Sequence, residues 1–194
     1  MMLLKNLEKY NIILASDSLR RQELLKELGL KFKVISSHSE ESFPEALGMT
    51  AIPEYLAGLK ANAVRKKMPE NYLLITADTI VWKDNKVLGK PIDRKDAIAI
   101  LECLSGSQHQ VITGMSLQTS EKKISFHAVT EVWFDDLTKE EIIYYVDKYE
   151  PYDKAGAYGI QEWLGYIGII KIEGSFYNVM GLPVHKLYQN LKRF

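Results

Sequence analysis

Hydroxyl and guanidinium side chains gather near the N-terminus, where an apolar stretch gives way to a helical pattern. Residues 11–15 form an apolar run typical of a strand, and Ser16, Ser18, Arg20 and Arg21 follow it directly. The start of a helix leaves backbone N–H groups pointing outward, and the helix dipole favours an anion there. Two arginines oppose that dipole, so their presence favours a strongly negative guest such as a polyphosphate. We interpret this junction as an anion cradle.

An ordinary helix start also accounts for these residue types. Ser16 or Ser18 could be the N-cap, with Glu23 in the first turn, and the two arginines could be solvated surface side chains. The local pattern leaves both interpretations open.

A second candidate is a carboxylate at the end of a predicted buried strand. The continuous apolar run over 72–77 is typical of a strand buried on both faces, and we expect it to end at Asp78 and Thr79. A charge at that place needs a cation or several donors, and a divalent metal, Lys90 and Lys60 are the candidates. A simple cap of a turn or helix is the alternative.

Taken together, these groups suit the hydrolysis of a phosphoanhydride. That reaction needs acids to hold Mg²⁺, a base for water, and cations for the phosphates. The acidic loop at Glu40 and Glu41 and the loop lysines Lys90 and Lys154 add to the set. No Gly-x-x-x-x-Gly-Lys-Ser/Thr sequence is present, which excludes a P-loop NTPase, and the four histidines lack zinc-ligand spacing.

The elements that must position these residues alternate irregularly between strands and helices. We predict an α/β fold, with a mixed twisted sheet and flanking helices in a two-lobed single domain over residues 1–194, and a ligand in a central cleft. Both Ser16 and Asp78 lie at carboxyl ends of predicted strands. The expected strands cover 11–15, 32–35, 72–77, 80–82, 87–88 and two or three segments of 110–134, and the expected helices cover 22–28, 52–68, 94–104, 142–146 and 184–191.

Composition narrows the classes of partner. Lys plus Arg and Asp plus Glu both number 25, so the formal net charge is zero and neither a nucleic-acid surface nor a membrane surface is expected. No uncharged run reaches the roughly 18 residues of a spanning helix. The single cysteine, Cys103, permits no internal disulfide and lies on an apolar helical pattern, where we expect a buried thiol. We expect a cytoplasmic protein.

Six blocks of the chain, in order, resemble the Maf family of nucleotide pyrophosphatases and together cover almost its whole length. The resemblance implies hydrolysis of a nucleoside triphosphate to the monophosphate and pyrophosphate, dependent on Mg²⁺ or Mn²⁺, by a cytoplasmic homodimer. It also implies an architecture similar to that of inosine triphosphatases. The blocks are Leu14–Leu25, Thr76–Val81, Leu88–Pro91, Leu104–Gly106, Asp153–Gln161 and Ile172–Pro183.

The same resemblance implies a role for each matching residue. Asp78 matches the family's proton acceptor, and Glu41 would help Asp78 to hold the metal. The residues that would line the triphosphate are Ser16, Arg21, Lys60, Lys90 and Lys154.

Three positions separate the branches of the family, and here they are Arg20, Thr79 and Gln161. This combination resembles the branch acting on dTTP and UTP rather than the branch preferring 7-methyl-GTP. The amide of Gln161 donates and accepts at once, which suits the edge of uracil or thymine, although an ordinary loop amide is the alternative.

Two departures from the family pattern bear on these expectations. Leu19 stands where the family usually has a proline, so the fixed φ at the first helical position is lost. Residues 162–168 differ from the shorter glycine-rich stretch usual after Gly-Ile-Gln, which bears on base selectivity.

The alternatives to a dTTP and UTP pyrophosphatase are an inosine or xanthosine triphosphate pyrophosphatase and a non-enzymatic nucleotide-binding regulator of cell division. The residues do not rank dTTP, UTP, CTP and modified pyrimidine nucleotides.

Overall fold

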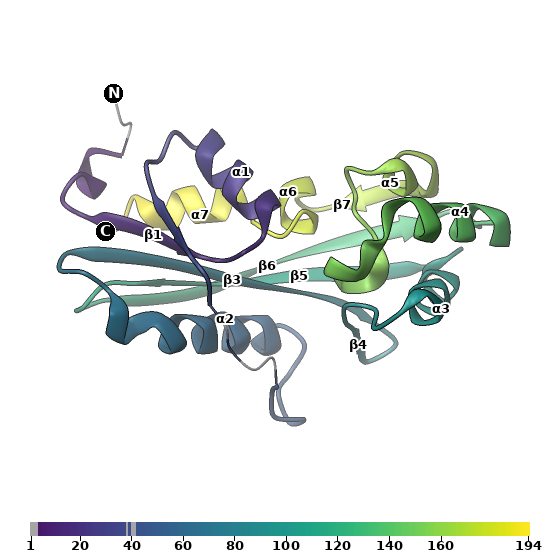
Figure 1. Ribbon diagram of the computed structural model, residues 1–194, viewed down its shortest axis with the longest axis horizontal. Coiled ribbons are helices and arrows are strands. Elements are labelled where there is room, and N and C mark those ends of the chain that lie inside the picture. Colours follow the sequence, from purple (N-terminus) through teal and green to yellow (C-terminus); the bar gives the residue numbers. More distant parts are fainter. Residues whose placement is uncertain (1–3, 38, 40–41) are drawn as a thin grey trace. The chain divides into compact units, whose positions relative to one another are not determined.

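A computed structural model describes residues 4–37, 39 and 42–194 and confirms the mixed α/β class. The chain forms two compact units: unit 1 is Met1–Asp78, Thr113–Ala128 and Gly181–Phe194, and unit 2 is Thr79–Ile112 and Val129–Met180. The strands are hydrogen-bonded in the order β2-β1-β3-β5-β6-β7, with β4 paired to β3 (Figure 1). Three long strands each contribute residues to both units: β3 (Tyr72–Lys83), β5 (Gln108–Gln118) and β6 (Lys123–Phe134).

In unit 1, β1 (Asn11–Ala15) lies parallel to both β2 (Lys33–Ile35) and β3. The first seven residues of β3 are all buried, as expected for a strand inside a sheet that is covered on both faces. Within this unit, Figure 1 shows α2 on one face of the strands and α1 and α7 on the other. The helical elements of unit 1 are η1 (Lys5–Leu7), α1 (Leu19–Glu27), α2 (Ala51–Val64), η2 (Arg65–Lys67) and α7 (Val184–Leu191).

In unit 2, β4 (Lys86–Leu88) folds back on β3 through a turn in which Asp84 and Asn85 both have positive φ. This geometry is the two-residue turn whose twist suits a hairpin. The edge strand β7 (Ile169–Glu173) pairs antiparallel with β6. The helical elements are α3 (Arg94–Leu104), α4 (Lys139–Tyr149), η3 (Pro151–Asp153), η4 (Ala155–Ala157), α5 (Trp163–Gly168) and α6 (Phe176–Val179).

Two helices in unit 2 begin with side-chain caps. The Asp93 side chain accepts from the Asp96 N–H at the start of α3. Thr138 and Glu141 form a reciprocal capping box at the start of α4. Both helices therefore begin where the sequence places a side-chain acceptor.

Two expectations about local structure were wrong. Asp78 does not end a strand, because β3 continues to Lys83 and finds a new partner in β4 from Val81 onward. The pairing of β1 with β3 ends at Leu14 and Ile75, so Asp78 lies beyond the end of β1 although it is inside β3. Cys103 is exposed, because α3 buries Ala97, Leu101 and Leu104 instead. Among the described helices, none is long and apolar enough to cross a membrane.

Candidate functional site

The junction between β1 and α1 is held by hydrogen bonds between its own residues. Ser18 is the N-cap of α1, and its Oγ accepts from the Arg21 N–H at 3.4 Å. The Ser18 N–H in turn donates to Ser16 Oγ at 3.3 Å. Ser16 is 6% exposed. The N-cap interpretation is thus confirmed for Ser18, whereas Ser16 lies just beyond the end of β1.

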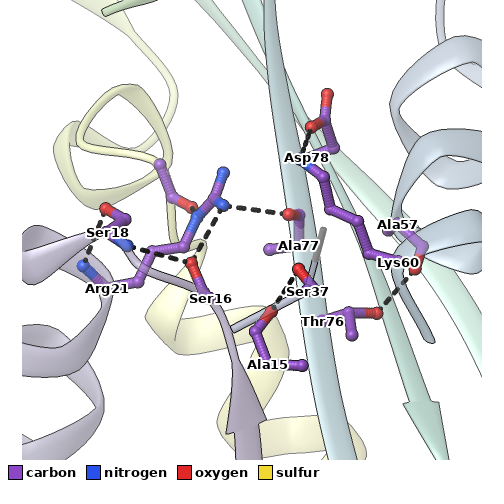
Figure 2. Close-up of polar contacts among 11 residues, drawn as sticks. Ala15, Ser16, Ser18, Arg21, Ser37, Ala57, Lys60, Thr76, Ala77 and Asp78 are labelled. Carbon is purple, nitrogen blue, oxygen red and sulfur yellow. Dashed lines mark hydrogen bonds and ion pairs between the residues drawn. The ribbon is translucent and has the colours of Figure 1, made fainter. Parts of the chain in front are cut away.

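Arg21 is not a solvated surface side chain, and its guanidinium joins three segments of unit 1. Its Nε donates to Gly181 O at 2.8 Å, and its Nη1 donates to Ala77 O at 2.9 Å and to Ser16 Oγ at 3.4 Å (Figure 2). Ala77 O is open to this contact because β1 has already ended at that level of β3. The Arg21 guanidinium, a permanent positive charge, is therefore bound to the backbone of Ala77, the residue that precedes Asp78.

Lys60 and Asp78 form a buried ion pair, which selects Lys60 from the candidate cations. The Lys60 Nζ donates to Asp78 Oδ1, and the two side chains are 11% and 9% exposed. Lys60 extends from α2, whose Ala57 O accepts from Thr76 Oγ1 at 2.7 Å and so fixes the helix against β3 (Figure 2). In unit 1, Arg21 thus binds Ser16 and the backbone of Ala77, and Lys60 pairs with Asp78, the next residue of β3 beyond the end of β1.

Of the two expected metal ligands, Asp78 lies among the described residues. Glu41, the other expected ligand, lies outside the described residues. Within 4–37, 39 and 42–194, no three His, Cys, Asp or Glu side chains gather as a metal site. A single aspartate still fits Mg²⁺, because this ion is commonly held by one or two carboxylates together with substrate phosphates and water.

Lys154 is a buried cation of unit 2 and lies between two carboxylates. Its side chain is 9% exposed, and its Nζ lies 2.7 Å from Asp153 Oδ1 and 3.2 Å from Glu162 Oε1. It stands between η3 and η4, where Gly156 has a φ of +72° and packs against Val81 so closely that a Cβ would lie 2.7 Å from Val81 Cγ2. The glycine therefore permits the close backbone approach that leads Lys154 into the interior.

Gln161, also in unit 2, carries a buried amide oxygen with no partner. Its Oε1 is shielded from solvent and accepts no hydrogen bond from any residue that the structure describes. A buried acceptor of this kind is rare and costs roughly 1–3 kcal/mol. A ligand with an N–H group would satisfy it.

The remaining expected site residues are Lys90, Thr79 and Arg20. Lys90 is exposed and follows β4, while Thr79 is half-buried in β3 directly after Asp78. Arg20 is half-buried in the first turn of α1.

Two residues that could not be found from the sequence contact the loop that carries Gln161 in unit 2. Tyr145 of α4 donates its hydroxyl proton to Glu162 Oε2 and accepts from the Gly159 N–H at 3.0 Å. Tyr145 lies on the apolar pattern of a helix, and Glu162 lies in the segment that departs from the family pattern. Neither position carries a local signal, because the contact joins residues 17 apart in the chain.

The sequence of the chain is similar to sequences of known proteins. Residues 11–194 match the family model of the Maf-like proteins. A protein of Bacteroides thetaiotaomicron named dTTP/UTP pyrophosphatase is 56% identical over 98% of this chain and 100% of its own length. A protein of the same name from Parabacteroides distasonis is 54% identical over 99% of this chain and 100% of its own length. One from Phocaeicola vulgatus is 55% identical over 98% of this chain and 100% of its own length.

A solved structure also resembles part of the chain. It is titled as a nucleoside-triphosphatase, or dITP/XTP pyrophosphatase, from Mycobacterium abscessus. It has a TM-score of 0.42 and 15% sequence identity, and the match covers 66% of this chain and 75% of that one.

Proposed function

Because the chain belongs to the Maf family, we propose that it hydrolyses dTTP and UTP to the monophosphate and pyrophosphate. The observation that carries this proposal is the buried Lys60–Asp78 ion pair in unit 1, with the Arg21 guanidinium bound to the carbonyl oxygen of the preceding residue, Ala77. A carboxylate kept beside fixed cations is what water attack on a polyanion needs, since one group must accept a proton while others neutralise phosphate charge.

In this proposal Asp78 is the general base. It accepts a proton from the water that attacks the α-phosphorus, and the bond from that phosphorus to the bridging oxygen of pyrophosphate breaks. Lys60 holds Oδ1 and thereby orients the carboxylate. Ser16, Arg21, Lys60, Lys90 and Lys154 bind the triphosphate through hydrogen bonds and positive charge.

A divalent cation, Mg²⁺ or Mn²⁺, completes the proposed site. Asp78 and Glu41 would hold it together with phosphate oxygens, and when bound it neutralises charge on the polyphosphate. Lys60 and the cation would then share the same carboxylate.

We assign the choice of base to Gln161, together with Arg20 and Thr79. Uracil and thymine each carry an N–H between two carbonyl groups, so they offer a donor to Gln161 Oε1 and acceptors to its amide nitrogen. The buried, unpartnered oxygen supports this assignment, because the N–H would satisfy it.

The proposal is tested with a substrate panel in the presence of Mg²⁺ or Mn²⁺. We expect dTTP and UTP to yield monophosphate and pyrophosphate, with slower turnover of CTP, ITP, XTP and 7-methyl-GTP. In H₂¹⁸O the label should appear in the monophosphate, because water attacks the α-phosphorus. Preference for ITP and XTP would establish the purine alternative, and binding of UTP without turnover would establish the regulatory one.

We further propose that the protein is a cytoplasmic homodimer whose partner is its nucleotide substrate rather than a nucleic acid or a membrane. Sedimentation equilibrium would test the dimer, and a monomer at micromolar concentration would contradict it.

A further inference from the structure

The loop that carries Gln161 is held by hydrogen bonds at three of its residues, all in unit 2. Tyr158 Oη lies 2.8 Å from His109 Nε2, and the Gly159 N–H donates to Tyr145 Oη at 3.0 Å. The Gln161 carbonyl accepts from Tyr166 Oη at 2.6 Å. The backbone on both sides of the Gln161 side chain is therefore fixed.

Tyr145 and Glu162 form the centre of this arrangement. Tyr145 is fully buried, and its hydroxyl serves both the Gly159 N–H and Glu162 Oε2. Burial and the hydrogen bond to Glu162 raise the pKa of Tyr145, so the hydroxyl stays protonated and keeps donating. The other carboxylate oxygen, Oε1, lies 3.2 Å from Lys154 Nζ. One tyrosine hydroxyl and one carboxylate thus connect the loop of Gln161 to a buried lysine.

The anchoring of this loop matters because Gln161 Oε1 is a buried acceptor without a hydrogen-bond partner among the described residues. Gln161 Oε1 loses the hydrogen bond that water would give it, so a loosely held loop would turn the amide toward solvent. Only surroundings that hold the backbone rigidly keep an unfavourable group in place, and preorganised groups bind their ligands with less loss of entropy. The anchors keep the acceptor available for a ligand.

We propose that Tyr145 and Glu162 are positioning residues that hold Gln161 for recognition of the base and Lys154 for binding of the phosphates. This inference rests on the roles proposed above for Gln161 and Lys154. It also assigns a role to Glu162, which lies in the segment 162–168 where the chain departs from the family pattern.

The test compares UTP with 3-methyl-UTP, in which the base lacks its N–H donor. A site built to bond an N–H group rejects an analogue without it, so we expect the wild-type kcat/KM to favour UTP by about 100-fold or more. In Tyr145→Phe and in Glu162→Gln we expect this ratio to fall by about tenfold, because Gln161 is no longer held. Lost charge at residue 162 affects both nucleotides alike and cancels in the ratio.

Matched controls separate positioning from general damage. Tyr144→Phe removes the neighbouring hydroxyl of α4, which bonds Lys148 at an exposed site, and Glu173→Gln removes an exposed carboxylate paired with Lys171. Both controls should keep the ratio within about twofold of the wild type. The double variant Tyr145→Phe/Glu162→Gln should be no worse than either single variant, because the two residues act through one contact.

The outcomes are distinct. If wild-type enzyme hydrolyses UTP but both single variants keep its ratio, the positioning role is overturned, even if their kcat/KM values fall. If the wild type itself fails to discriminate between the two nucleotides, the role of Gln161 is overturned, and the positioning role with it. Should Tyr145→Phe not fold, Glu162→Gln decides alone, since Glu162 is partly exposed.

Discussion

Lys60 both neutralises and orients the carboxylate of Asp78. The two side chains are about one-tenth exposed, so the removal of either charge breaks a buried ion pair, which is strongly destabilising. A variant of Asp78 must therefore keep a hydrogen-bond acceptor for Lys60 if it is to report on chemistry rather than on folding. Asparagine meets this condition, because its amide oxygen occupies the place of one carboxylate oxygen.

We predict that Asp78→Asn lowers kcat on dTTP and UTP by about 100-fold or more, because the variant has no group to accept the proton of water. Binding of α,β-imido-dUTP, whose first phosphoanhydride link resists hydrolysis, should change only a few-fold by calorimetry. Asp84→Asn is the matched control, since Asp84 lies in the exposed β3–β4 turn with a φ of +48° that asparagine tolerates. An Asp78→Asn enzyme with a near-normal rate would defeat the assignment of the base.

The sequence predicts which residues belong to the candidate site better than it predicts which partners they contact. The sequence indicated that Asp78 needs a cation but not that Lys60 supplies it, because that choice depends on how α2 packs on β3. Arg21 was expected to face an anion, yet it also binds the carbonyl oxygens of Ala77 and Gly181. Such contacts join residues up to 160 positions apart, so no local pattern reveals them.

Among the elements, α2 and β5 approach each other most closely at Gly114. A Cβ at this position would lie 2.2 Å from the backbone of Pro53 and Glu54. Backbone atoms cannot move aside as a flexible side chain can, so the helix itself would have to shift. Because α2 carries Lys60, this contact also sets the depth of the lysine that pairs with Asp78.

We predict that Gly114→Ala destabilises the protein by at least about 2 kcal/mol, measured by urea denaturation, and also lowers kcat because Lys60 is displaced. Gly48→Ala is the control, since nothing lies within 4 Å of a Cβ there, and it should change the free energy of unfolding by less than about 0.5 kcal/mol. Equal stability of the two variants would show that α2 does not depend on the contact.

Element boundaries followed the sequence at α3, where the Asp93 side chain caps the helix. They failed at Asp78, where a polar residue suggested the end of a strand. The length of β3 depends instead on its partners, since β1 pairs with its first part and β4 with its last part. Strand ends therefore depend on long-range pairing more than helix ends do.

At the scale of the whole molecule, the sequence predicts a two-lobed single domain over residues 1–194, and the chain forms two compact units. Three strands contribute residues to both units, so neither unit has a complete set of strands of its own. We therefore propose that the units unfold together. The three tryptophans, Trp82, Trp133 and Trp163, all belong to unit 2 and report on it alone.

We predict that tryptophan fluorescence and far-ultraviolet circular dichroism give coincident urea transitions, because fluorescence follows unit 2 and dichroism follows both units. The enzyme without nucleotide should be used, since a bound ligand would add its own stabilisation. A second dichroism transition, silent in fluorescence, would mean that unit 1 unfolds separately.

The global stability should also depend on pH through His109. This side chain is 2% exposed, and its ring lies edge-on to Phe134 and Tyr158, at centroid distances of 5.1 and 5.5 Å. Burial, helped by the charge of Lys83, lowers the pKa of His109 from 6.5 to about 3. Below pH 6.5 the unfolded chain therefore takes up a proton that the folded chain refuses, so stability present above pH 6.5 is lost progressively as the pH falls toward 3.

Between pH 7 and pH 5 this difference amounts to about 2 kcal/mol of unfolding free energy. We predict that His109→Phe removes that part of the pH dependence, although its stability at pH 7 also changes because Tyr158 loses a hydrogen-bond partner. His185→Phe, at an exposed position of α7, should keep the wild-type dependence. Urea denaturation at half-unit pH steps measures the slopes, and parallel curves for wild type and His109→Phe would show that another group governs the loss in acid.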